Sequence, residues 1–242
     1  MDFNDINREN IGAFIAQHSI IRPVALTSHV FWFFPVGLCV FFFSSLFLTP
    51  AMVGETNYAE PIGRVIVIVL LVAGIILRRF LVKLDETEPG KSMYLTEMFT
   101  NMLVAIAALL MWFNLAELMY GLRDSLIQLS ILSASTLMSL ICTHYIVRDW
   151  IKKGKFIGYE GKLGKKIAYS TTGTGVIVYV AIAAILRSIA SLHLVVIAAA
   201  GLVLCSTNIA LLYYLKLRYA KKYGLEEYLP DRPLPSEYTG EE

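Results

Sequence analysis

The sequence predicts an all-α, polytopic membrane protein with six transmembrane helices, a short N-terminal amphipathic interfacial helix and both termini in the cytoplasm. Of its 242 residues, 57% are apolar and only 17% are charged, and the mean hydropathy is +0.62. Soluble domains hold about 45–50% apolar and about 25% charged residues. One soluble core of this size cannot bury so many apolar side chains, so a lipid bilayer is the expected surrounding. The net charge of +2 is too small to indicate nucleic acid as a partner.

Six apolar segments have the length that a membrane-spanning helix requires. Crossing the hydrocarbon takes roughly 20 mostly apolar residues. The segments are 30–48, 62–82, 99–119, 126–147, 175–190 and 192–215. Arg78 and Arg79 shorten the second segment, and we expect them to reach toward the interface. The last two segments meet at Ala190 and Ser191. They form either a tight hairpin or a partly re-entrant unit, and we favour the hairpin.

The distribution of basic residues predicts the orientation. Lys and Arg accumulate in cytoplasmic loops. With the N-terminus inside, 18 of the 21 Lys and Arg residues fall in cytoplasmic segments, and only Arg64, Arg123 and Arg187 fall outside. Both termini are therefore predicted to be cytoplasmic. Compact loops and the lack of a targeting signal favour the bacterial inner membrane.

Residues 1–26 form the predicted cytoplasmic N-terminal segment. Apolar side chains alternate there with polar ones at helical spacing: Ile6, Ile11, Phe14, Ile15 and Ile21. This pattern is typical of a helix that lies in the membrane interface. The alternative is a plain polar tail.

The remaining chain divides into a membrane domain and a tail. Residues 27–217 hold the six spans, and residues 218–242 form a cytoplasmic tail rich in proline and acidic residues. Such a composition does not fold alone. The tail is either a docking strip for a partner or simply solvated.

A basic, glycine-rich stretch of 26 residues, 148–173, is expected to form a loop between the fourth and fifth spans. We expect it to lie along anionic lipid headgroups, where each Lys or Arg adds about 1 kcal/mol. The expected headgroup contacts are Arg148, Lys152, Lys153, Lys155, Lys162, Lys165 and Lys166.

Polar groups within the predicted spans are candidate functional residues, because they are costly there. The candidates are Asn114, Glu117, Gln128 and Arg187. Glu117 and Arg187 both lie toward outer ends of their spans, so they either form an ion pair or reach separately to the external interface.

The fourth predicted span carries a polar face. Gln128, Ser135 and Cys142 recur every seven residues, and Thr136, Ser139 and Thr143 follow beside them with spacings of three and four residues. Small hydroxyl residues allow helices to approach closely and to form hydrogen bonds between them. The face therefore indicates either helix packing, the commoner explanation, or a solute path.

The sequence carries no motif of a catalytic or cofactor site. The zinc-protease, phosphate-loop and nucleophile-elbow patterns are absent. Cys39, Cys142 and Cys205 lie in apolar stretches and do not have the spacing of a metal or redox motif. We predict no catalytic residue, no metal and no cofactor.

Three function classes follow from this pattern. We favour a non-catalytic membrane subunit of a multi-component transport or secretion assembly, with membrane lipids and other membrane proteins as partners. The first alternative is a stand-alone or homo-oligomeric transporter or channel for an apolar or small solute. An amphipathic helix before six spans broadly looks like an exporter permease, although no motif supports that likeness. The second alternative is an enzyme that modifies lipid headgroups.

Overall fold

The computed structural model describes residues 8–16, 59–157, 163–185 and 194–229. Every element in these ranges is helical, which confirms the all-α class. The elements are α1 (Arg8–Ala16), α4 (Ala59–Thr87), α5 (Pro89–Lys152), α6 (Leu163–Ile185), α7 (Leu194–Tyr223) and the short 3-10 helix η2 (Glu226–Tyr228). The predicted span 30–48 lies outside the described residues.

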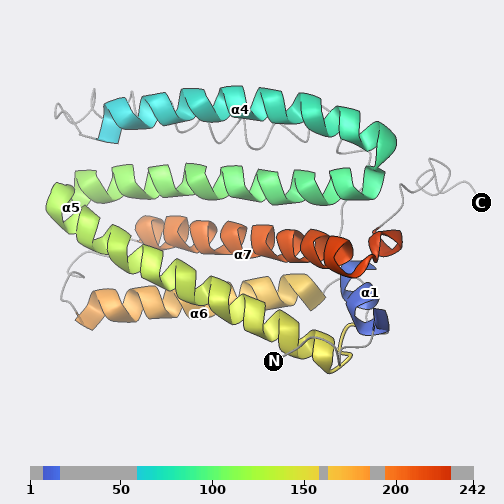
Figure 1. Cartoon of the computed structure of the whole chain (residues 1–242). Helices are drawn as coiled ribbons and strands as arrows, with labels where there is room; N and C mark the ends of the chain where they lie inside the picture. Colours follow the sequence, from blue (N-terminus) through green and yellow to red (C-terminus); the bar gives the residue numbers. More distant parts are fainter. Residues whose placement is uncertain (1–7, 17–58, 158–162, 186–193, 230–242) are drawn as a thin grey trace, which may run out of the picture.

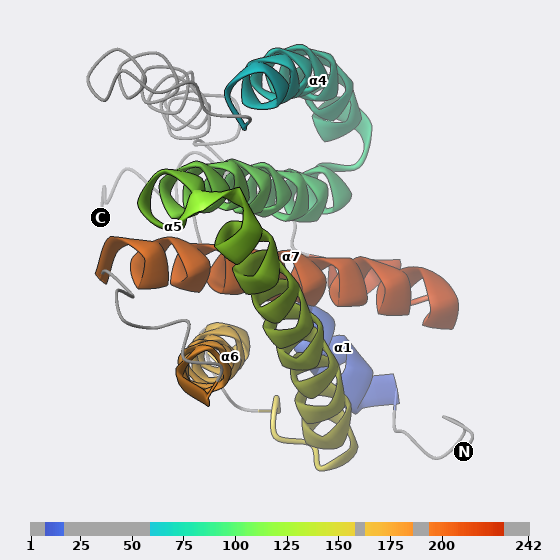
Figure 2. The ribbon, with the colours of Figure 1, turned by 90° about the vertical axis from the view of Figure 1, so that its left-hand side faces the viewer.

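The longest element, α5, consists of two helical arms joined at Gly121. This glycine has φ 79° and ψ 165°, a positive-φ conformation that glycine adopts without a steric cost. The chain reverses there, and the second arm runs back at an angle to the first (Figures 1 and 2). The two arms contain the predicted spans 99–119 and 126–147.

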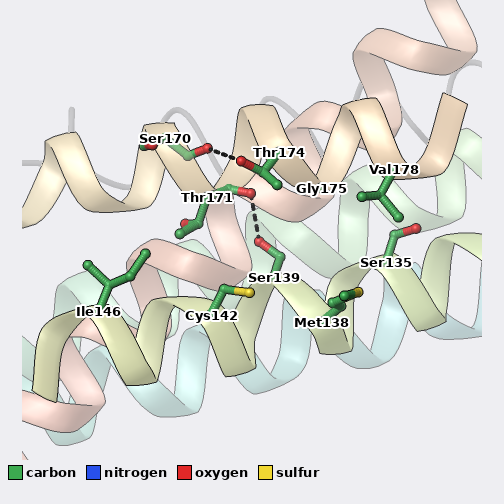
Figure 3. Close-up of a pocket in the computed structure, with 10 residues that line it drawn as sticks. All are labelled: Ser135, Met138, Ser139, Cys142, Ile146, Ser170, Thr171, Thr174, Gly175 and Val178. Carbon is green, nitrogen blue, oxygen red and sulfur yellow. Dashed lines mark hydrogen bonds between the residues drawn. The ribbon is translucent and has the colours of Figure 1, made fainter. Parts of the chain in front are cut away.

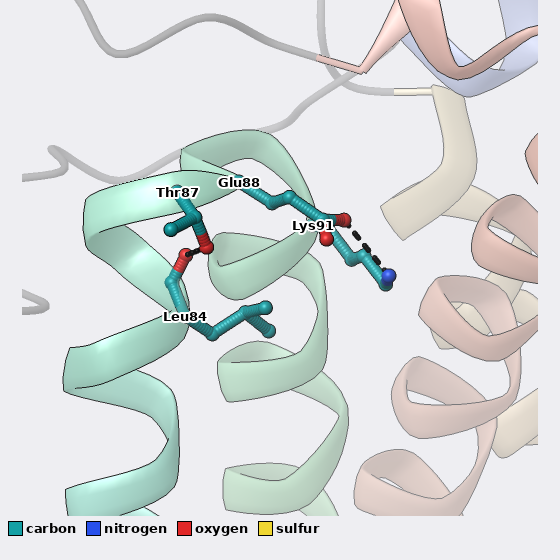
Figure 4. A network of polar contacts seen from close by, with 4 residues as sticks. All are labelled: Leu84, Thr87, Glu88 and Lys91. Carbon is teal, nitrogen blue, oxygen red and sulfur yellow. Dashed lines mark hydrogen bonds and ion pairs between the residues drawn. The ribbon is translucent and has the colours of Figure 1, made fainter.

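A tight turn at Glu88 joins α4 to α5. The backbone N–H of Glu88 donates to the Leu84 carbonyl at 2.8 Å, and the Thr87 hydroxyl donates to the same carbonyl at 3.2 Å. Lys91 Nζ lies 2.8 Å from Glu88 Oε2 across the turn (Figure 4). The short connection brings α4 and the first arm of α5 side by side in opposite directions (Figure 1).

Three helical segments of the described chain are long and apolar enough to cross a membrane. They are Pro89–Glu117, Tyr120–Lys152 and Val196–Tyr223. In the last of these 56% of the most apolar part is buried inside the protein, against 33% in each of the others. The helix α7 is therefore the central helix, and α5 and α6 both pack against it. The predicted spans 62–82 and 175–190 fall on α4 and, in part, on α6, and the six-span count stays a prediction.

One end of the bundle collects most of the basic residues. The end of α4, both ends of α5, the start of α6 and the end of α7 meet there, beside α1 (Figure 1). We call this the basic end. The segments that meet there carry Arg8, Arg78, Arg79, Lys83, Lys91, Arg148, Lys152, Lys153, Lys155, Lys165, Lys166, Lys216, Arg218, Lys221 and Lys222. Successive helical segments thus run alternately toward and away from the basic end, and this explains why basic connections alternate with non-basic ones along the sequence.

The predicted N-terminal helix exists as α1, but its apolar face is covered by protein. Ile11, Phe14 and Ile15 are at most 1% exposed. They share a hydrophobic cluster with Val147 of α5 and Tyr219 of α7. These side chains are covered by α5 and α7, because the end of the bundle offers an apolar surface that hydropathy alone does not reveal. The position of α1 in the membrane interface stays a prediction.

The expected 26-residue loop is also shorter than predicted. Helix α5 continues to Lys152, and α6 begins at Leu163, so residues 163–173 are helical. Hydroxyl side chains in this part bond to their own helix: Thr171 donates to Ile167 O at 2.9 Å and Thr174 donates to Ser170 O at 3.1 Å. Packing against α5 and α7 stabilises a glycine-rich helix whose composition alone favours a loop.

The alternating arrangement predicts that the two ends of the bundle lie on opposite sides of a membrane. Leu122→Cys is placed beside the Gly121 reversal and Ile157→Cys at the basic end, each in a chain without other cysteines. We expect a membrane-impermeant maleimide to label Leu122→Cys from outside and Ile157→Cys only from the cytoplasm in inverted vesicles. Labelling of both positions from one side would contradict the arrangement.

Candidate functional site

A buried network of polar side chains joins the three central helices. Its members are Ser139 and Thr143 of α5, Thr171 and Thr172 of α6, and Asn208 of α7. We call it the Asn208 network. Asn208 and Thr143 are fully buried, and Ser139 and Thr171 are at most 4% exposed. Its members on α5 and α7 lie within the segments Tyr120–Lys152 and Val196–Tyr223, which are apolar enough to span the membrane.

The amide of Asn208 uses all of its hydrogen-bonding groups in this network. Its Nδ2 donates to Ser139 Oγ at 2.8 Å and to Thr172 Oγ1 at 3.2 Å. Its Oδ1 lies 3.0 Å from the Thr143 hydroxyl. Ser139 in turn donates to the Thr171 backbone carbonyl at 3.0 Å. The amide therefore bonds to α5 on one side and to α6 on the other.

The hydroxyl of Thr143 has a choice of two acceptors. Thr171 Oγ1 lies 2.7 Å away, and Asn208 Oδ1 lies 3.0 Å away. Thr171 bonds to backbone carbonyls of its own helix, so its oxygen is available to accept. A hydroxyl has one proton, which Thr143 shares between the two helices.

Four residues of the predicted polar face of α5 are buried in the bundle. Gln128, Ser135, Ser139 and Thr143 are buried at 0, 1, 4 and 0% exposure. Thr136, which the spacing also placed beside this face, is only partly buried and donates to Leu132 O of its own helix at 2.8 Å. Buried hydroxyls that bond across helices stabilise the contact between those helices.

A pocket of about 190 Å³ lies beside the Asn208 network, between α5 and α6 (Figure 3). Its lining is made of small polar and apolar side chains: Ser135, Met138, Ser139, Cys142, Ile146, Ser170, Thr171, Thr174, Gly175 and Val178. Within the described part of the chain, the buried hydroxyl of Ser135 has no hydrogen-bond partner. The lining of the pocket therefore includes a serine whose buried hydroxyl has no partner among the described residues.

Three of the four polar residues that the sequence singled out within the spans lie in the described part of α5. Asn114, Glu117 and Gln128 are buried at 4, 9 and 0% exposure, on either side of the Gly121 reversal. Tyr179 of α6 donates to Gln128 Oε1 at 3.3 Å. Arg187 lies outside the described residues, so the ion pair between Glu117 and Arg187 stays a prediction. None of the three described residues is among the members of the Asn208 network.

The expected headgroup contacts divide into two groups. Lys152, Lys153, Lys155 and Lys166 are exposed at the basic end, and Arg148 is half-buried. Lys165 lies in the first turn of α6, and Lys162 lies outside the described residues.

Two of the exposed lysines already have partners within the protein. Lys153 Nζ lies 2.7 Å from Asp149 Oδ2, and Lys155 Nζ lies 5.0 Å from the centre of the Trp150 ring. These two ammonium groups are therefore less available to lipid than those of Lys152 and Lys166.

Sequence reasoning missed a buried lysine at the basic end. Lys216 of α7 is 5% exposed. Its Nζ lies 5.6 Å from the Phe14 ring, 5.1 Å from the Tyr94 ring and 5.8 Å from the Tyr213 ring. An ammonium within about 6 Å of a ring centre is attracted to the negative face of the ring. The signal in the sequence was the position of Lys216 inside an apolar, aromatic run.

Contacts around Lys216 hold α1 against the bundle. The Tyr94 hydroxyl donates to the Ile15 backbone carbonyl. Tyr228 of η2 packs on Gly12 so closely that a Cβ at Gly12 would lie 2.6 Å from the ring. The centres of the Phe14 and Phe156 rings lie 5.0 Å apart, with the ring planes tilted by 56°. Four separate parts of the chain, α1, α5, α7 and η2, therefore meet at this end.

The described residues contain no group of three or more His, Cys, Asp or Glu side chains that could hold a metal ion. Cys142 and Cys205 are both free thiols in partly buried positions. Comparison with known proteins gives no match: no protein-family model, no curated protein and no solved structure resembles the chain.

The Asn208 network predicts coupling between α5 and α7. Asn208→Leu removes the amide, and because hydrogen bonds between membrane helices contribute about 0.6 kcal/mol on average, we expect a loss of about 1–3 kcal/mol in the free energy of unfolding. Thr143→Val should lower the free energy of unfolding by less in the Asn208→Leu background than it does alone.

Unfolding in mixed detergent micelles measures the free energies of the single and double variants. Thr136→Val is the control, because its hydroxyl bonds only within α5, and strict additivity for the Thr143 pair would contradict the network.

The ring contacts of Lys216 predict that Phe14→Leu loosens α1. The substitution keeps an apolar side chain but removes the ring that Lys216 and Phe156 contact, at a cost of about 0.5–2 kcal/mol. We expect hydrogen exchange of the α1 amides to become faster, and less so in a Lys216→Met background. Phe80→Leu, at an exposed position on α4, is the control. Unchanged exchange in α1 would refute the role of the ring.

Proposed function

We propose that this protein is a non-catalytic integral membrane subunit of a multi-component transport or secretion assembly. The proposal places both termini in the cytoplasm, counts six spans, and assigns the protein to the bacterial inner membrane. Its partners are other membrane proteins of the assembly and the anionic lipids around its basic end.

The observation that carries the proposal is the use of the buried polar groups. The Asn208 amide bonds to Ser139 and Thr172, and Gln128 bonds to Tyr179. These groups hold helices together, whereas a solute path needs polar groups that are free to bind what passes. A protein whose interior is committed to packing is suited to a structural role beside other subunits.

The contacts of α1 support the same role. A cytoplasmic helix whose apolar face is buried against α5 and α7 adds a rigid feature to the basic end. Its exposed side includes Arg8 and Glu9. A rigid polar surface at the cytoplasmic end suits contact with a further component, because little conformational entropy is lost on binding.

The experiment that tests the proposal is isolation of the intact assembly. The full chain with a C-terminal affinity tag is extracted in mild detergent, cross-linked and purified, and the untagged chain provides the control. We expect other membrane proteins to copurify in fixed proportion. A self-contained homo-oligomer would contradict the proposal.

A transporter for a small solute is the second candidate, and the pocket beside Ser135 favours it. The pocket is open between α5 and α6, and the Ser135 hydroxyl has no partner among the described residues. Under this candidate the purified protein alone moves solute into liposomes, and Ser135→Leu, which fills the pocket, abolishes the flux. Absence of flux from the purified chain would exclude this candidate.

A further inference from the structure

We propose that a second pocket, at the basic end, binds one anionic phospholipid, with its phosphate held by Arg218 and Lys221 and its acyl chains lying along α5 and α7. The pocket has a volume of about 660 Å³, within the range of sites that bind small molecules. Its lining residues come from α5, α7 and the segment around η2: Glu88, Lys91, Leu95, Met98, Tyr214, Leu217, Arg218, Ala220, Lys221, Glu226 and Leu229.

Two helix faces build the pocket. Glu88, Lys91, Leu95 and Met98 follow each other at the start of α5 with spacings of three, four and three residues. Such spacings place side chains on one face of a helix. This end of α5 lies beside the end of α7, and the two run in opposite directions (Figure 1).

The facing side of α7 has the same order of side chains. Tyr214, Leu217, Arg218 and Lys221 are spaced by three, one and three residues and also share one face. On both helices the charged members lie nearer the end of the bundle, and the apolar members lie nearer its middle. The pocket is therefore polar at its mouth and apolar toward the membrane interior.

The charges at the mouth favour an anion. Lys91 is already paired with Glu88 at 2.8 Å. Arg218 and Lys221 are exposed, and the structure gives neither of them an ion pair with a described residue. Glu226 is the one further acidic residue that lines the pocket. Helix α5 also begins here, and the start of a helix carries partial positive charge.

The apolar part of the pocket identifies the anion as a lipid. Leu95, Met98 and Leu217 are partly buried, and the Tyr214 ring is 46% exposed. They lie in the segments Pro89–Glu117 and Val196–Tyr223, which are apolar enough to span the membrane. A free phosphate makes no favourable contact with these apolar side chains, whereas the acyl chains of a phospholipid can pack against them and bury them. Basic pockets between membrane helices on the cytoplasmic side are typical sites for lipid headgroups.

This site differs from a general attraction of lipid to the basic end. Lys152 and Lys166 are exposed lysines at the same end of the bundle but do not line the pocket. If the attraction is diffuse, lipid affinity depends only on the total charge of the basic end. If the site is discrete, lipid affinity depends on which two basic residues are replaced. The two double variants Arg218→Gln/Lys221→Gln and Lys152→Gln/Lys166→Gln remove the same charge and therefore separate the two explanations.

Native mass spectrometry of the full chain, titrated with lipid in detergent, tests the proposal. We expect one phosphatidylglycerol to bind ahead of the others, and phosphatidylcholine with the same acyl chains to bind more weakly. Arg218→Gln/Lys221→Gln should weaken the phosphatidylglycerol site roughly 30-fold. The Lys152→Gln/Lys166→Gln control should change it by less than about 3-fold, since these residues add only diffuse attraction. All four positions are exposed, so both variants should fold as the unchanged chain does.

Three results would overturn the proposal. Equal binding of the two lipids would show that the headgroup charge is not recognised. Equal weakening by the two double variants would show a diffuse basic surface instead of a site. Displacement of the lipid by soluble glycerol phosphate at similar concentration would show a site for free phosphate, in which the apolar lining has no role.

Discussion

The amide of Asn208 is the contact on which the packing of the central helices depends. Inside a membrane, a polar group without a partner is costly, so the amide has to be satisfied by other side chains. It bonds to Ser139 on one helix and to Thr172 on another. Close approach of these helices is possible because Gly175 has no side chain, and a Cβ there would lie 3.2 Å from Leu204. One amide and one glycine thus position α5, α6 and α7 together.

The basic end of the bundle is organised by aromatic rings and by a single buried lysine. Lys216 faces three rings that come from α1, α5 and α7. Because a buried ammonium loses its hydration, the rings compensate by offering their negative faces. The same rings bury the apolar face of α1, which anchors the N-terminal helix where the chain is most basic. The same aromatic rings therefore both contact the buried ammonium group of Lys216 and pack against α1.

The sequence predicted those parts of the fold that depend on composition and spacing. Apolar runs located the arms of α5, and the seven-residue recurrence of Gln128 and Ser135 identified a buried face. The helical start of α6 was missed because its glycines and threonines favour loops unless a neighbouring helix covers them. Lys216 was missed for the same kind of reason: its surroundings come from three segments far apart in the sequence. Contacts between such segments have no signal in local periodicity.

Our central claim is that the buried polar groups form hydrogen bonds between helices. Such groups are not available to a passing solute, and this favours the structural subunit as the function. The most direct test of this claim is the accessibility of Ser139→Cys in a chain whose Cys39, Cys142 and Cys205 are replaced by alanine. A charged, membrane-impermeant thiol reagent should fail to modify this cysteine from either side of the membrane, while Ile157→Cys reacts readily. Rapid modification of Ser139→Cys in the folded protein would show an aqueous path through the bundle and contradict the claim.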